Sequence, residues 1–367
     1  MGLGLSRRAL VAAFASFAVC AAVVAAPVAR AEGEEEMPAE HSAYDMALAE
    51  GGMPEGWTLL KSADGAADEN ALKDAVLALA KEKGAAADKL HFVTRSATAA
   101  EGKAVFALID LDERADAFSI ALKDAAAGKG WAFRAMGAPT RLLVVAAPEA
   151  LREKAVALQS SWAAKMLAVK ATSALEARNG PRAVLMAKTA IAIDPKSAGA
   201  NSVIGRMMSG EAIQAAQHQG EDAPAMLKKA IDMMKLSVSK EATGGLTPGE
   251  RASTLGELGL TLLYVKTTKA DEEARDVLKE AVGLPFDEPR TGIVARYNLA
   301  CSYGRLKDLD NAFKELTATL EANAKSPVEG IGNGWRQDAD FENLKADPRW
   351  AELEKKYPAT GGDVGGY

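Results

Sequence analysis

The fold is decided by the stretch Tyr297-Asn298-Leu299-Ala300-Cys301-Ser302-Tyr303 and by the residues that follow it. A short turn, Lys307-Asp308-Leu309, separates this stretch from a second apolar series, Ala312, Leu316 and Leu320. Both series follow the three- and four-residue spacing of one helix face, and a turn of this length joins helices that pack against each other. The sequence therefore predicts a hairpin of two helices, which we call helix A and helix B.

Three further hairpins precede this one, and the same kinds of small and apolar residues recur in them. They are Ala183, Ala187, Ala190 and Pro195 on helix B of the first hairpin; Ile204, Gly205 and Met208 on helix A of the second; and, in the third, Leu255, Leu258, Gly259 and Leu262 on helix A with Ala274, Leu278, Ala281 and Pro285 on helix B. A single hairpin cannot bury its own apolar face, whereas stacked hairpins bury each other's. The series predicts a helical solenoid.

These residues resemble the tetratricopeptide repeat family, a helix–turn–helix unit of about 34 residues. The resemblance covers about residues 155–325 and implies small residues where helices A and B cross. The second unit departs from the family by an insertion near His218 to Asp222, and the third by extra residues from Lys266 to Asp271. After the repeats, the tail resembles the ending of such arrays. There Asp347 is the expected N-cap and Trp350 the expected cover for the solenoid's end.

Residues 56–150 show strand and helix signals in the order β-α-β-β-α-β-β-α. Apolar runs such as Val105-Phe106 predict buried strands, and Leu72, Val76 and Leu79 share one helix face. The order predicts an α+β domain, with a ferredoxin-like split βαβ topology as the best arrangement.

The N-terminus has the pattern of a secretory signal peptide. Arg7 and Arg8 precede a long apolar run that ends at Ala29-Arg30-Ala31, so we expect cleavage after Ala31. A retained membrane anchor is the alternative, and export through the general or the twin-arginine route stays open. The localisation expected is periplasmic or secreted, in a bacterium.

The expected organisation of the whole chain follows from these signals. The parts are a signal peptide (1–31), an acidic flexible linker (32–55), the α+β domain (56–150), the repeats (151–325), a C-terminal loop and capping helix (326–357), and a Gly-rich tail (358–367). The glycine-rich stretch Gly330 to Gly334 is interpreted as the flexible connection before the capping helix.

Composition excludes several classes of function. The net charge is −6, and it becomes more negative once Arg7, Arg8 and Arg30 are removed, which argues against nucleic acid or an anionic membrane as partner. Cys301 is then the only cysteine, so neither an internal disulfide nor a Cys₄ zinc site is expected. We interpret Cys301 as a small buried residue rather than a reactive thiol.

No pattern of catalytic or metal-binding residues stands out. His41, His91 and His218 have no second histidine three or four residues away, and no nucleophile elbow, metalloprotease motif or phosphate-binding loop is present. We therefore predict no enzyme activity, no catalytic, cofactor-binding or metal-binding residues, and no cofactor.

The resemblance implies a scaffold that binds a protein or peptide partner in the concave groove lined by the A helices. The family's groove positions fall on Arg206, Glu257, Tyr264, Tyr297, Asn298 and Arg305. Two alternatives remain. In the first, the α+β domain is a small-molecule-binding or enzymatic module and the repeats serve as its docking arm. In the second, the chain is an assembly factor that self-associates.

Overall fold

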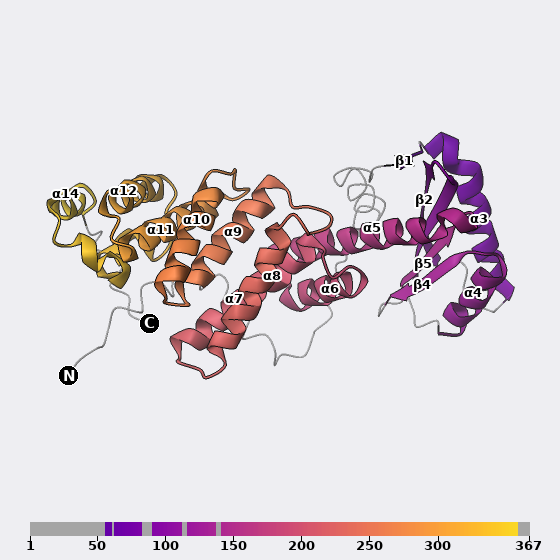
Figure 1. The fold of residues 1–367 in the computed structure, drawn as a ribbon, viewed down its shortest axis with the longest axis horizontal. Helices are drawn as coiled ribbons and strands as arrows, with labels where there is room; N and C mark the ends of the chain where they lie inside the picture. The colour runs from indigo at the N-terminus through magenta and orange to yellow at the C-terminus, as the bar shows by residue number, and fades with distance from the viewer. Residues whose placement is uncertain (1–55, 61, 83–89, 112–115, 137–140, 359–367) are drawn as a thin grey trace, which may run out of the picture. The chain divides into compact units, whose positions relative to one another are not determined.

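A computed structural model describes residues 56–60, 62–82, 90–111, 116–136 and 141–358 (Figure 1). The expected signal peptide and acidic linker lie outside these residues. Apart from the turn Arg178–Gly180, the described chain divides into two compact units, and the boundary between them in the sequence follows Ala200. None of the helices in the described ranges combines the length and hydrophobicity that crossing a membrane requires.

The first unit confirms the predicted α+β domain and its order of elements. They are β1 (Thr58–Leu59), α3 (Ser62–Glu82), β2 (Leu90–Ala99), β3 (Gly102–Leu111), α4 (Asp116–Gly128), β4 (Ala132–Met136) and β5 (Arg141–Ala146). The same unit also contains α5 (Glu149–Glu176) and α6 (Gly180–Ile193), which form a helical hairpin.

The strand order corrects the ferredoxin-like prediction in one respect. The sheet runs β1-β2-β3-β5-β4, and each neighbouring pair is antiparallel. One split βαβ unit is present, because β3 and β4 are parallel, are joined by α4 and have β5 between them. A ferredoxin-like sheet has its first strand in the interior, whereas β1 here has only two residues and lies at the edge. β5 takes the interior position between β3 and β4, and its residues are apolar enough for burial on both faces.

Alternate residues of the central strands supply two cores. On one face, Ile109 and Val144 pack with Leu72 and Val76 of α3 and with Leu122 of α4. The opposite face carries Phe106, whose ring meets Trp162 of α5 edge to face at 4.9 Å. Gln159 of α5, almost fully buried, donates hydrogen bonds of 3.0 Å to the carbonyl oxygens of Ala107 and Val144. These contacts fix α5 to the sheet.

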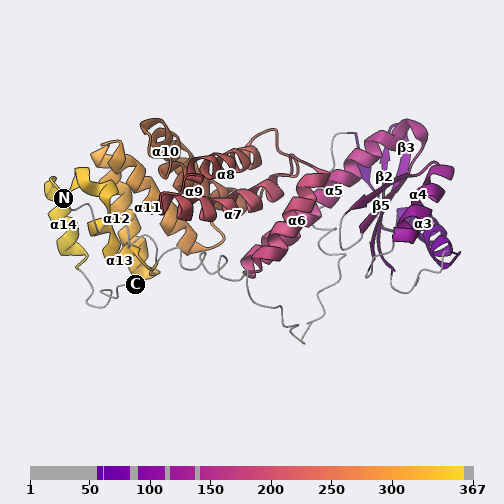
Figure 2. The same ribbon diagram turned by 90° about the horizontal axis from the view of Figure 1, so that it is seen from below.

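The second unit is the helical array, and its helices form consecutive hairpins (Figure 2). They are α7 (Ala198–Gln217) with α8 (Ala223–Val238), α9 (Pro248–Leu263) with α10 (Thr268–Val282), and α11 (Pro289–Arg305) with α12 (Leu309–Lys325). The predicted succession of hairpins is confirmed. In each pair the first helix is helix A and the second is helix B.

Glycine permits the close crossing of A and B helices at two of the predicted positions. A β-carbon on Gly205 of α7 would lie 2.6 Å from Cγ of Met234 on α8. A β-carbon on Gly259 of α9 would collide with the side chain of Leu278 on α10, which is fully buried. Neither helix pair could approach so closely around a larger residue.

After α12 the chain forms what we call the C-terminal segment, residues 330–344. It contains α13 (Ile331–Gly334) and the 3₁₀ turns η3 (Trp335–Gln337) and η4 (Ala339–Leu344). The interpretation of Gly330 to Gly334 as a mere connection is wrong. The stretch makes a helical turn because Ile331 and the fully buried Trp335 anchor it in the core.

Helix α14 (Pro348–Lys356) closes the array. Asp347 is its N-cap, and its side chain accepts a hydrogen bond from the backbone N–H of Arg349. The Trp350 ring packs on those of Trp335 and Phe341, with centroid distances of 4.8 Å and 6.4 Å. Trp350 thus joins the capping helix to the C-terminal segment.

Candidate functional site

A cavity of about 270 Å³ lies where the C-terminal ends of α7 and α9 meet α11 and the C-terminal segment. All of its lining residues belong to the helical unit. They are Ala216, Gln217, Leu260, Leu263, Tyr264, Lys266, Asn298, Cys301, Arg305, Gly330, Gly334, Asp338, Ala339 and Asp340. The A helices of three successive hairpins therefore contribute to one cavity.

The structure brings together part of the predicted groove set. Tyr264, Asn298 and Arg305 line the cavity, and Tyr297 lies beside it in contact with Asp338. Arg206 and Glu257 do not line it and form a separate group.

Arg305 is the cation at the centre of the site. Its Nη1 donates 2.7 Å to the carbonyl oxygen of Leu263, at the C-terminal end of α9, and 3.1 Å to Oδ1 of Asp271. Its Nε lies 3.0 Å from Oδ1 of Asp340. The guanidinium therefore connects α11 to α9, α10 and the C-terminal segment. It stabilises the packing of these elements and also lines the cavity.

Tyr297 and Cys301 lie on one face of α11 and meet Asp338. The Tyr297 hydroxyl donates a 2.6 Å hydrogen bond to Oδ2 of Asp338, and the Cys301 sulfur lies 4.0 Å from the same oxygen. Burial first, and then the neighbouring Asp338 and Asp340 charges, raise the pKa of the Cys301 thiol well above its usual range. The predicted burial of Cys301 is confirmed.

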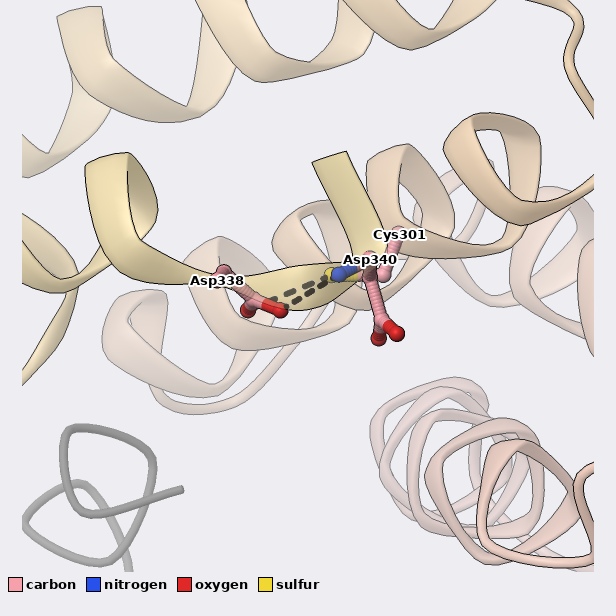
Figure 3. A group of neighbouring side chains, drawn as sticks. All are labelled: Cys301, Asp338 and Asp340. Atoms are coloured by element: carbon pink, nitrogen blue, oxygen red, sulfur yellow. Dashed lines mark hydrogen bonds between the residues drawn. The ribbon is translucent and has the colours of Figure 1, made fainter. Parts of the chain in front are cut away.

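Asp340 is an acid of the cavity whose pKa is clearly raised. Burial first, and then the Asp338 carboxylate, raise its pKa to about 6, while Arg305 acts in the opposite direction. Figure 3 shows Asp338 directed toward the Cys301 sulfur and the backbone nitrogen of Asp340, to which it is hydrogen-bonded at 2.9 Å. The side chain of Asp340 extends away from that of Asp338 (Figure 3).

The opposite wall of the cavity is less charged. Gln217 at the end of α7 donates a 3.1 Å hydrogen bond to the hydroxyl of Tyr264. Leu260 and Leu263 supply an apolar surface beside them. Asn298 is only 4% exposed, and its side chain has no hydrogen-bond partner among the residues that the structure describes.

The separate group connects α7 to α9 by a ladder of hydroxyls. Ser202 pairs with Thr254 and Ser209 pairs with Thr261, both at 2.7 Å. Ser209 also donates 2.6 Å to Oε1 of Glu257. Burial raises the pKa of Glu257, partly offset by this hydrogen bond and by Arg206. These two predicted groove residues thus belong to the packing between neighbouring A helices.

A second cavity of about 530 Å³ lies along α8 and the start of α10. Leu227, Ile231 and Leu262 line it, and Lys228, Lys235 and Lys269 stand around it. Tyr264 lines both cavities, whereas Lys269 lines only this one.

The chain is similar to proteins of known structure, among them YrrB. No family model and no curated protein matches it. YrrB is described as a TPR protein with an unusual peptide-binding site. The two share 18% identity, the match covers 57% of this chain and 96% of YrrB, and the TM-score is 0.34. A likeness at this level supports no conclusion about function. The evidence for the helical-hairpin fold is the packing of this chain's own helices.

Asp338 and Asp340 are the site residues that sequence reasoning missed. The pattern of the array's ending did not single them out, and 37 residues separate Cys301 from Asp338. No local spacing indicates that contact.

Proposed function

We propose that the chain is a scaffold protein that binds an extended segment of a protein partner through the A helices of its helical unit. The observation that carries this proposal is the convergence of α7, α9 and α11 on the cavity beside Tyr264. Successive repeats that contribute to one recess suit a ligand that runs from one repeat to the next.

The chemistry of the cavity wall supports a peptide as the occupant. Gln217 and Asn298 carry amide groups that both donate and accept hydrogen bonds, which suits a peptide backbone. Leu260 and Leu263 offer an apolar surface for a side chain of the ligand. Asp338 and Asp340 disfavour a phosphate backbone, which is consistent with a protein rather than a nucleic acid as partner.

The proposal extends to where the protein acts. The basic residues, the apolar run and the Ala-x-Ala site of the first 31 residues support export, with cleavage after Ala31. The protein is proposed to act without catalysing a reaction. Self-association through the same surface is a competing outcome that a concentration-dependent change in molecular size would favour.

The test is selection from a displayed library of random peptides against the helical unit in the full chain. A selected peptide is then titrated against the double variant Gln217→Ala/Tyr264→Ala. These two side chains line the cavity without holding the C-terminal segment. We expect 1:1 binding to the wild type and at least a tenfold loss in the variant.

The matched control is Lys269→Ala, which alters only the second cavity. A peptide whose binding depends on Lys269 and not on Gln217 and Tyr264 would contradict the proposed surface. Equal binding to all three proteins would place the peptide elsewhere and contradict it as well.

A further inference from the structure

We infer that Cys301, Asp338 and Asp340 form a binding site for one divalent transition-metal cation of the zinc class, which fastens the C-terminal segment to α11. The three residues line the cavity proposed for the peptide, but the two proposals are tested through different residues. A metal site here differs from the sequence-based expectation that the chain binds no metal, which considered only histidine pairs and sets of cysteines.

The geometry of the three side chains is the first observation. One ligand atom from each of the three lies within 4.8 Å of the other two. Zinc–sulfur and zinc–oxygen bonds of about 2.3 and 2.0 Å place neighbouring ligand atoms of a tetrahedral site about 3.4 Å apart. The Cys301 sulfur is already 4.0 Å from Oδ2 of Asp338. Small side-chain movements would bring the three ligand atoms to this spacing.

The second observation is Asn298, which precedes Cys301 by one helical turn. The side chain lines the same cavity, is 4% exposed and has no hydrogen-bond partner in the described ranges. Its oxygen, directly or through a water molecule, would complete the coordination of a cation held by the other three residues.

Groups that hold the proposed ligands in place are also present. The Tyr297 hydroxyl donates to Asp338, and the backbone N–H of Asp340 donates to the same carboxylate. The Arg305 guanidinium binds Oδ1 of Asp340 and leaves Oδ2 for another contact. Metal sites are commonly built in this way, with ligand carboxylates fixed by hydrogen bonds from an outer set of groups.

The charge around the cavity favours a cation. Asp271, Asp338 and Asp340 face Arg305 and Lys266, which leaves an excess of negative charge when all are ionised. The C-terminal ends of α7 and α9, which carry the negative end of the helix dipole, also line the cavity. A bound cation would offset this charge.

The mixture of ligands indicates which cation. A thiolate selects borderline and soft metals over Mg²⁺ and Ca²⁺, whereas two carboxylates are harder than the ligands that Cu⁺ prefers. Zn²⁺ accepts both kinds of ligand. On binding, the Cys301 thiol loses its proton to solvent and the sulfur forms the bond to the metal, without any change of oxidation state.

The test uses the full chain with Cys20→Ser, so that Cys301 is the only thiol. The chain is stripped with a chelator and titrated with Co²⁺. Binding through sulfur gives a thiolate-to-cobalt charge-transfer band, and competition with a chromophoric chelator gives the Zn²⁺ affinity. We expect one equivalent of metal and a Zn²⁺-dependent rise in melting temperature.

Two ligand variants and one control decide the result. Cys301→Ser removes the charge-transfer band, and Asp340→Asn weakens Zn²⁺ binding at least tenfold. Asp310→Asn, on the exposed side chain that pairs with Arg349, leaves both readouts unchanged. If the Cys301→Ser protein does not fold, the band in the parent protein and the Asp340→Asn titration still decide the question.

Three results would overturn the inference. They are the absence of the cobalt band in the parent protein, a band that survives Cys301→Ser, and equal Zn²⁺ affinity in the parent and Asp340→Asn proteins. Each of these leaves peptide binding untouched, because the peptide test uses residues outside the proposed metal site.

Discussion

The hydroxyl of Tyr297 on α11 donates a 2.6 Å hydrogen bond to Asp338, 41 residues later in the C-terminal segment. Tyr297 is 3% exposed, and its ring meets that of Phe341 edge to face at 5.5 Å. The last repeat is thus joined to the chain's own ending by a residue that the family resemblance assigns to the partner groove. The C-terminal segment therefore occupies part of the surface that the repeats offer.

The first prediction concerns this hydrogen bond in the metal-free protein. Tyr297→Phe removes the hydroxyl but keeps the ring contact, so the Asp338 carboxylate loses a donor in a partly buried place. Hydrogen bonds to charged groups contribute about 1.5–3 kcal/mol, and we expect a loss of that order in the free energy of unfolding, measured with urea.

Tyr303→Phe is the matched control on the same helix. Tyr303 is also buried, and among the described residues its hydroxyl has no hydrogen-bond partner. We expect a change below about 0.5 kcal/mol for a substitution that removes no interaction. Equal losses from the two variants would show that the Tyr297–Asp338 contact does not stabilise the unit.

The second prediction concerns the crossing of α9 with α10. Gly259→Ala places a methyl group against the fully buried Leu278. Overpacking of this kind costs about 1–3 kcal/mol, and we expect a fall of that size in the free energy of unfolding.

Gly210→Ala tests the same substitution in α7, where a β-carbon would meet nothing within 4 Å. Alanine is favoured over glycine in an exposed helix by about 0.8–1.0 kcal/mol, so this variant should be more stable than the wild type. The two substitutions should therefore have opposite signs in one urea experiment. A shared sign would contradict the close crossing at Gly259.

The helical array could be predicted because its determinants are local. Gly205 and Gly259 lie where helix A crosses helix B closely, and this crossing has the same place in both hairpins. The periodic apolar residues around them indicate the helices. The order of strands and helices in the first unit could be predicted for the same reason, since each element carries its own apolar pattern.

The pairing of strands and the site could not be predicted in this way. The position of β5 between β3 and β4 depends on its pairing with those strands. The sequence of a strand does not indicate which strands it pairs with. The meeting of Cys301 with Asp338 depends on how the C-terminal segment lies across α11, where the carbonyl oxygen of Asp340 lies 2.5 Å from a β-carbon placed on Gly304. Contacts between distant segments leave no periodic signal.

The third prediction concerns the attachment of α5 to the sheet. Gln159→Leu keeps the volume of the side chain but removes the amide that donates to Ala107 and Val144. Loss of a buried partner costs about 1–3 kcal/mol. We expect hydrogen exchange to accelerate in β3 and β5, measured by mass spectrometry. Acceleration confined to the helical unit would contradict this role for Gln159.

The last prediction concerns Glu257, the partly buried acid between α7 and α9. Because burial raises the pKa of Glu257, the folded protein holds its proton more tightly than the unfolded chain does. The stabilising effect of that proton is complete below the ordinary glutamate value of about 4.3 and is lost as pH rises through the higher pKa of the folded state.

Glu257→Gln removes this titration while keeping an acceptor for Ser209. We therefore expect the variant to be more stable than the wild type at neutral pH, by a margin that shrinks as pH falls toward the ordinary glutamate value. Urea unfolding at a series of pH values measures the difference. The exposed Glu352→Gln serves as control, because it removes the same charge from the surface of α14. A margin for Glu257→Gln that grows on acidification would show that the Glu257 carboxylate is stabilised, rather than penalised, by its place between the two helices.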